Sequence, residues 1–146
     1  MRNALARGVA MLAALLVVQA TTSLSQEYDP PTYKEDPRLL ILRDFFEERG
    51  SPVPHLARDF LIAADRNGLD WRLLPSIAVV ESGAGRAFRN NNLFGWDNGD
   101  HGFPSVREGI HLVAWKLGNS KLYKNKNLDE KLATYNPYPH YPPLVK

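Results

Sequence analysis

Glu81 is the residue whose type and spacing point most directly to chemistry. Leu74, Ile77, Ala78 and Glu81 follow one another at i, i+3, i+4 and i+7, so on a helix they share one face. Burial disfavours the charged form of a carboxyl group, and the negative end of the helix dipole acts in the same direction in the last turn. A carboxyl group that keeps its proton can serve as a general acid. The alternative is a solvated glutamate at a frayed helix end.

The residues that follow Glu81 predict a cleft beside it. Ser82-Gly83-Ala84-Gly85 is a small-residue exit from the helix, which leaves space next to the carboxyl group. Amides can hydrogen-bond sugar hydroxyl and N-acetyl groups, and a tryptophan can pack on a sugar ring or, alternatively, in the core. The next segment supplies both kinds of side chain: Asn90, Asn91, Asn92, Phe94 and Trp96.

Two short motifs resemble a known family. Ala78-Val79-Val80-Glu81-Ser82-Gly83, followed by Asn91-Asn92-Leu93-Phe94-Gly95, is similar to the flagellar-type glucosaminidase family (mannosyl-glycoprotein endo-β-N-acetylglucosaminidase-like) of the lysozyme-like superfamily. The resemblance covers residues 54–137, and Phe103-Pro104-Ser105, Tyr123 and Tyr135-Asn136 fit it as well. The last pair is also similar to a motif of the related lytic transglycosylases. Their glycine-leucine-methionine-glutamine segment is absent here, which favours the glucosaminidase branch.

The resemblance implies an enzyme that cuts β-1,4 bonds in the glycan strands of peptidoglycan. It implies Glu81 and Tyr135 as catalytic residues, with Glu81 as the general acid. It places the substrate wall at Asn92, Phe94 and Trp96, and we also expect Ser82, Asn91 and Asp97 to bind substrate. We expect no cofactor and no metal, a peptidoglycan or related N-acetylated glycan as partner, no nucleic acid, and a monomer. The alternatives are a lytic transglycosylase, a non-catalytic module that binds cell-wall glycan, and a periplasmic scaffold.

A hydrolase with two acids needs a second carboxylate near the first, and the sequence offers three candidates. Asp97 and Asp100 lie in a turn-rich segment, and Glu108 follows Ser105 in the spacing of a capping box. We therefore expect no rigid, buried second acid beside Glu81. The reaction then depends on the substrate's N-acetyl group, on a mobile loop acid, or on internal attack that forms an anhydro sugar.

Other reactive groups are sparse. The chain has 146 residues and a net charge of +2. It has no cysteine, which excludes thiol chemistry, disulfides and thiolate metal sites. The four histidines lack metal-ligand spacing, and no serine nucleophile elbow or phosphate loop is present. Arg86 and Arg89 are expected at the surface; the alternative is that they hold a carboxylate of the peptide stem.

The elements that position these residues are predicted to be helices, which indicates a mainly α or α-rich α+β domain, and the resemblance implies that this domain has the lysozyme-like fold. Apolar periodicity, capping residues and glycine stops predict about five of them. Leu93–Trp96 and Phe103 form either a short loop or a β-hairpin around Asn98-Gly99, and the proline-rich tail is expected to be irregular. The helices are expected at about 37–49, 55–67, 71–82, 106–118 and 128–135.

The first 25 residues have the features of a secretory signal peptide. Arg2 and Arg7 precede an apolar stretch over Gly8–Val18, which is shorter than the roughly 20 residues that span a bilayer. Small residues follow at Val18-Gln19-Ala20 and at Ser23-Leu24-Ser25. We expect cleavage here, export to the periplasm or medium, and no stable membrane span afterwards; the alternative is an uncleaved anchor or a buried helix.

The mature part is predicted to hold one domain. Residues 26–37 carry several prolines and are expected to form a linker, and residues 38–146 the lysozyme-like glucosaminidase domain. Without disulfides, this domain depends on its apolar core for stability.

Overall fold

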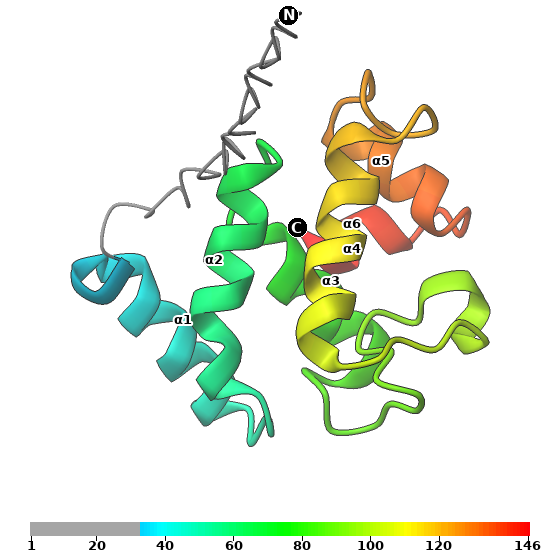
Figure 1. Cartoon of the computed structure of the whole chain (residues 1–146). Coiled ribbons are helices and arrows are strands. Elements are labelled where there is room, and N and C mark those ends of the chain that lie inside the picture. The colour runs from blue at the N-terminus through cyan, green and yellow to red at the C-terminus, as the bar shows by residue number, and fades with distance from the viewer. Residues whose placement is uncertain (1–32) are drawn as a thin grey trace, which may run out of the picture.

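The computed structural model describes residues 33–146, and these residues form six α-helices and three short 3-10 helices. In Figure 1, α1 and α4 lie on either side of α2, and α3 lies behind α4. The last two helices pack against each other, and α6 also contacts α3. The α-helices are α1 (Pro37–Glu48), α2 (Ala57–Arg66), α3 (Leu73–Ser82), α4 (Val106–Asn119), α5 (Leu128–Tyr135) and α6 (Tyr141–Val145), and the 3-10 helices are η1 (Tyr33–Glu35), η2 (Pro54–Leu56) and η3 (Trp96–Gly99).

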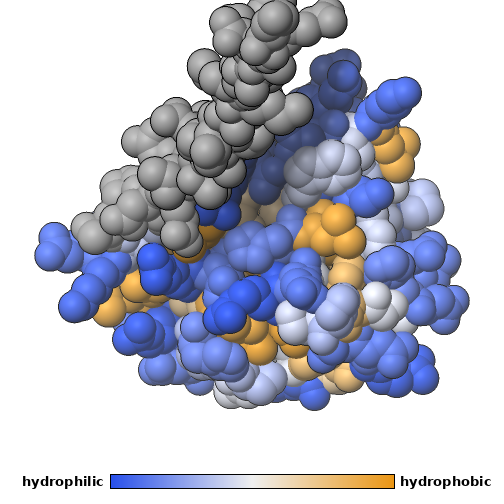
Figure 2. Space-filling model, in the orientation of Figure 1, coloured by the Kyte–Doolittle hydropathy of each residue, from blue (hydrophilic) through white to orange (hydrophobic). Residues whose placement is uncertain are grey.

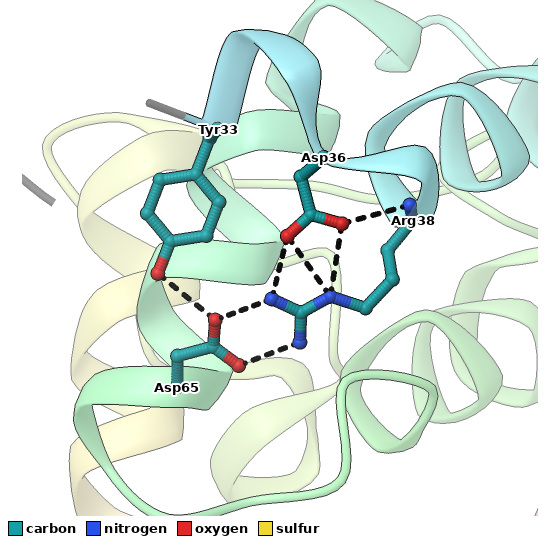
Figure 3. Close-up of polar contacts among 4 residues, drawn as sticks. All are labelled: Tyr33, Asp36, Arg38 and Asp65. Atoms are coloured by element: carbon teal, nitrogen blue, oxygen red, sulfur yellow. Dashed lines mark hydrogen bonds and ion pairs between the residues drawn. The ribbon is translucent and has the colours of Figure 1, made fainter. Parts of the chain in front are cut away.

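Charged side chains join the start of α1 to the end of α2. Asp36 caps α1 by accepting a hydrogen bond from the backbone N–H of Arg38 at 2.9 Å. Figure 3 shows the Arg38 guanidinium between the carboxylates of Asp36 and Asp65, while the Tyr33 hydroxyl donates to Asp65. Hydrogen bonds from Arg38 hold the pKa of both carboxyl groups below its usual value. This network therefore stabilises the packing of α1 on α2 where the described residues begin.

Large aromatic side chains connect the helices to the loop that follows α3. Phe46 of α1, Phe60 of α2 and Phe94 of the loop are fully buried. The rings of Phe46 and Phe60 have centroids 4.9 Å apart, and those of Phe60 and Phe94 lie 6.1 Å apart. Because Phe94 belongs to this core, the loop around it is held against the helices.

A glycine allows α4 to approach the end of α2 closely. A Cβ atom on Gly118 would lie 2.5 Å from the backbone oxygen of Asn67, so any other side chain would collide with the main chain. One residue later, the amide of Asn119 donates to the side-chain oxygen of Asn67 at 2.6 Å. The absence of a side chain at position 118 thus determines how α2 and α4 pack.

α3 carries Glu81 and begins later than its apolar pattern alone suggests. Pro75 is the third residue of the helix, a position whose N–H has no helical partner, so the proline breaks no hydrogen bond. The side chains of Leu74, Ile77 and Ala78 are fully buried. Gly83 ends the helix in the left-handed conformation with φ 60°. The predicted inward face of this helix is confirmed.

The mainly α class is confirmed, with two corrections in detail. Within residues 33–146 no strand forms, so the segment over 93–103 is the loop alternative and the β-hairpin was wrong. Asp97, which would end the first strand of that hairpin, has φ 53° and ψ 52°, whereas a strand residue must be extended. The tail is also not wholly irregular, because it forms α6, whose Tyr141 and Val145 side chains are buried.

The prolines that suggested an irregular tail are compatible with α6. Pro142 and Pro143 lie in its first turn, where a proline removes no helical hydrogen bond. At the start of α5, Asn127 and Glu130 form a complete capping box. At α4 only the Ser105 side chain caps the helix, by accepting from the backbone N–H of Glu108.

The surface in the orientation of Figure 1 is largely hydrophilic, with hydrophobic residues in scattered patches (Figure 2). None of the helices over residues 33–146 combines the length and the apolar character that a bilayer crossing demands. The predicted signal peptide and all but the last few residues of the predicted linker lie outside the described residues.

Candidate active site

A cleft of about 930 Å³ opens beside the end of α3. Its walls come from the end of α3, the loop between α3 and α4, the residues after α4, and the end of α5 with the segment that follows. The lining residues are Glu81, Ala87, Phe88, Arg89, Asn92, Gly95, Trp96, Asp97, Asn98, Gly99, Tyr123, Tyr135, Asn136, Pro137 and Tyr138. Parts of the chain far apart in sequence therefore converge on Glu81.

The carboxyl group of Glu81 fits against a glycine of the loop. Glu81 is partly buried in the last turn of α3. A Cβ atom on Gly95 would lie 2.6 Å from Oε2 of Glu81, well inside van der Waals contact. Gly95 also has φ 59°, a conformation that favours glycine. Both its backbone angle and its close approach to Glu81 therefore favour a glycine at position 95.

The tyrosine of α6 faces the carboxyl group of Glu81. The Tyr141 hydroxyl is buried and has no hydrogen bond of standard geometry within the described part of the chain. Burial raises the pKa of Tyr141 far above its usual value, and the nearby Glu81 carboxylate, to which the hydroxyl points as a donor, raises it further. The neutral hydroxyl is thus available to donate a proton in a hydrogen bond to Glu81.

The tyrosine of α5 is held in place by contacts on both sides. Its hydroxyl donates to the backbone oxygen of Phe94 at 2.5 Å. The Tyr135 and Tyr141 rings are stacked, with centroids 5.9 Å apart and an interplanar angle of 11°. Burial, and then the charge of Glu81, raise the pKa of Tyr135 well above its usual value. Tyr135 therefore stays neutral and rigid beside the acid.

Trp96 forms an aromatic wall of the cleft. Its ring contacts Tyr135 edge-on at 5.6 Å between centroids, and its distance from the Tyr123 ring is 6.3 Å. The side chain is only partly buried, so it both packs on the core and lines the cleft. The two roles considered for Trp96 from the sequence are therefore compatible.

Asn92 acts as a clamp on the loop that carries Trp96. Its side-chain nitrogen donates to the backbone oxygens of Trp96 and His101, at 2.8 and 2.9 Å. Its side-chain oxygen accepts from the backbone N–H of Trp96 at 2.9 Å. Although Asn92 lines the cleft, its amide is already hydrogen-bonded to these backbone groups. Its role is therefore to fix the conformation of the loop.

Three other predicted substrate residues lie away from the cleft lining. Ser82 is buried; its hydroxyl donates toward the backbone oxygens of Ala78 and Leu93 and accepts from the N–H of Gly85. The Asn91 amide donates to the backbone oxygen of Phe103, and Phe94 belongs to the core. Their contacts are with the protein itself. The remaining predicted residues all line the cleft: Glu81, Tyr135, Asn92, Trp96 and Asp97.

Asp97 is the one cleft-lining carboxylate besides Glu81 within residues 33–146. Its side chain is exposed, and its backbone has φ 53° in the loop. Asp100 and Glu108 do not line the cleft. A rigid, buried second acid is therefore not found among the described residues around Glu81.

Sequence reasoning missed several contributors to the site. Tyr141 was hidden in a proline-rich tail, although its buried partner Val145 follows four residues later, at helical spacing. Arg89 lines the cleft, whereas Arg86 donates to the backbone oxygen of Gly83 and does not line it. Tyr138 and the segment around it reach the cleft only because the tail folds back, which no local pattern reveals.

A scan of the sequence against protein-family models, a search among curated proteins and a search among solved structures each gave no significant match.

Proposed function

We propose that this protein cleaves the β-1,4-linked glycan strands of peptidoglycan, with Glu81 as the general acid. The observation that carries the proposal is the position of Glu81 at the wall of a cleft of about 930 Å³, among tyrosines and next to Trp96. Concave sites with aromatic walls and a few convergent polar groups are typical of ligand binding, and aromatic faces suit sugar rings. The resemblance of the motifs around Glu81 and Gly95 to flagellar-type glucosaminidases supports the same activity.

The first chemical step is protonation of the leaving group. Glu81 in its protonated form donates to the glycosidic oxygen as the bond to the anomeric carbon breaks. This transfer leaves a carboxylate on Glu81. The neutral hydroxyl of Tyr141, buried and facing that carboxylate, donates to it and stabilises the charge that develops.

In the second step, a nucleophile attacks the anomeric carbon and neutralises the positive charge that develops on the sugar ring. A rigid carboxylate partner is not present near Glu81 in the described part of the chain, and Asp97 is exposed in its loop. We propose that the N-acetyl group of the substrate itself attacks the anomeric carbon, after which water completes hydrolysis. Asp97 then contributes less than Glu81, by orienting this group or the water.

Mass spectrometry of digested peptidoglycan tests this proposal. Reducing N-acetylglucosamine ends correspond to the glucosaminidase that we propose, reducing N-acetylmuramic ends to a muramidase, and anhydro ends to a lytic transglycosylase. Binding to insoluble peptidoglycan without release of any soluble fragment would contradict the catalytic proposal. An Asp97→Asn variant that loses all cleavage while folded would identify Asp97 as the second acid.

We also propose that the protein acts outside the cytoplasm, since its substrate lies there. The motif pattern of the first 25 residues supports export. Detection of the protein without these residues in a periplasmic or culture fraction would test this point.

A further inference from the structure

The cleft contains one cation. Within residues 33–146, Arg89 is the single lysine or arginine among its lining residues, and it belongs to the loop between α3 and α4. Arg89 is an exposed residue. None of the ion pairs within residues 33–146 involves it. It therefore enters the cleft without a counter-ion from the described part of the chain.

The backbone beneath Arg89 is fixed. Its carbonyl oxygen accepts from the N–H of Asn92 at 2.8 Å, and the next carbonyl, of Asn90, accepts from the N–H of Phe103 at 2.9 Å. Asn90 and Asn91 both have positive φ, which makes the turn tight. The Arg89 side chain thus extends from a backbone whose conformation is fixed by these hydrogen bonds.

The nearest other arginine of this loop differs in its contacts. Arg86 is also exposed, but its Nε donates to the backbone oxygen of Gly83 at 2.9 Å, and it does not line the cleft. Its role is explained by capping the end of α3. Arg89 has no such partner among residues 33–146, so its guanidinium is available to bind a ligand in the cleft.

A guanidinium binds planar carboxylates with two parallel hydrogen bonds. Resting on the proposed function, we infer that Arg89 binds a carboxylate of the glycan strand and that the cleft selects strands that carry one. Two groups of peptidoglycan offer this chemistry: the lactyl carboxylate of a muramic acid that carries no peptide, and a carboxylate of the stem peptide where one is attached. Glycans built from N-acetylglucosamine alone offer neither.

Binding measurements in the Glu81→Gln background test this inference independently of catalysis. Three ligands are compared: strands with stem peptides, strands stripped of peptides so that the lactyl carboxylate is free, and chitin oligosaccharides. Adding Arg89→Gln should weaken binding of carboxylate-bearing strands roughly tenfold, the loss expected for one charged hydrogen-bonding group, and leave chitin unchanged. Arg86→Gln is the matched control and should leave all three affinities unchanged.

The pattern of losses identifies the carboxylate. Weaker binding of stripped strands alone assigns the lactyl carboxylate to Arg89, because in peptide-bearing strands this carboxyl group forms the amide bond to the peptide. Weaker binding of peptide-bearing strands alone assigns a carboxylate of the stem peptide, and weaker binding of both shows that Arg89 accepts either carboxylate. Arg89→Lys should retain part of the affinity, since it keeps the charge but not the planar fork. An equal loss for all three ligands, or no loss for any, overturns the inference.

Failure of this inference is distinguishable from failure of the proposed function. If cleavage depends on Glu81 but binding does not depend on Arg89, the proposed function stands and the inferred carboxylate site is wrong. If binding depends on Arg89 but the parent protein cleaves nothing, the carboxylate site stands and the proposed function is wrong.

Discussion

Replacing Gly95 with alanine should separate the geometry of Glu81 from the stability of the protein. The new Cβ atom would lie 2.6 Å from Oε2 of Glu81, and ordinary contact begins near 3.4 Å. The carboxyl group must therefore move by about 0.8 Å. Because it is the far end of a flexible side chain, this movement costs little folding free energy. A shift of this size in a catalytic group lowers the rate by about 10²-fold.

Gly50→Ala is the matched control for this prediction. Gly50 has φ 60°, almost the same as Gly95, but a Cβ atom there has no neighbour within 4 Å. Both alanine variants pay the left-handed backbone cost of about 1–2 kcal/mol. Urea unfolding should therefore give similar free energies of unfolding for the two variants.

The two variants should differ in activity. Release of soluble fragments from peptidoglycan should fall about 10²-fold for Gly95→Ala and stay near the parent rate for Gly50→Ala. Equal activity of the two variants, at equal stability, would show that the position of the Glu81 carboxyl group beside Gly95 does not matter for function.

Three further substitutions probe the site and the packing of α1. Asn92→Ala removes a buried amide that holds three backbone groups and should lower the free energy of unfolding by ~3 kcal/mol in urea titrations. Tyr141→Phe should lower turnover about tenfold without loss of thermal stability, since it removes a buried hydroxyl that points to Glu81 and has no standard hydrogen bond; a less stable variant with parent activity would contradict this role. The pKa of Asp65 is held down by Arg38 in the folded state, so its stabilising effect is full above the unfolded pKa of about 3.9 and is lost as the pH falls below it. Unfolding free energies at about pH 5 and pH 3 should therefore differ less in Asp65→Asn than in the parent, and an identical difference would refute the contribution of this carboxylate.

Local patterns were sufficient to predict most helices, because their signals lie next to each other in sequence. Asp36 followed by Pro37 is a local signal for the start of α1, and Asn127 three residues before Glu130 is one for the start of α5. The apolar spacing before Glu81 predicted which face of α3 is buried. In each case a few neighbouring residues determine the outcome.

The shape of the cleft depends on contacts between distant residues, which local patterns do not encode. Asn92 determines the path of the loop by binding Trp96 and His101, and this favours η3 over a hairpin. Tyr141 reaches Glu81 only after the tail has folded back on α3. The same kind of limit explains why an asparagine expected to bind substrate is instead committed to backbone groups.

The most direct test of the central claim is the activity of Glu81→Gln on purified peptidoglycan. This change keeps the shape of the side chain and removes the proton that the proposed reaction needs, so no soluble fragments should be released while the fold is retained. Glu48→Gln is the control, since Glu48 is exposed at the end of α1, and it should match the parent rate. A folded Glu81→Gln protein that releases fragments as fast as the parent would contradict the assignment of Glu81 as the general acid.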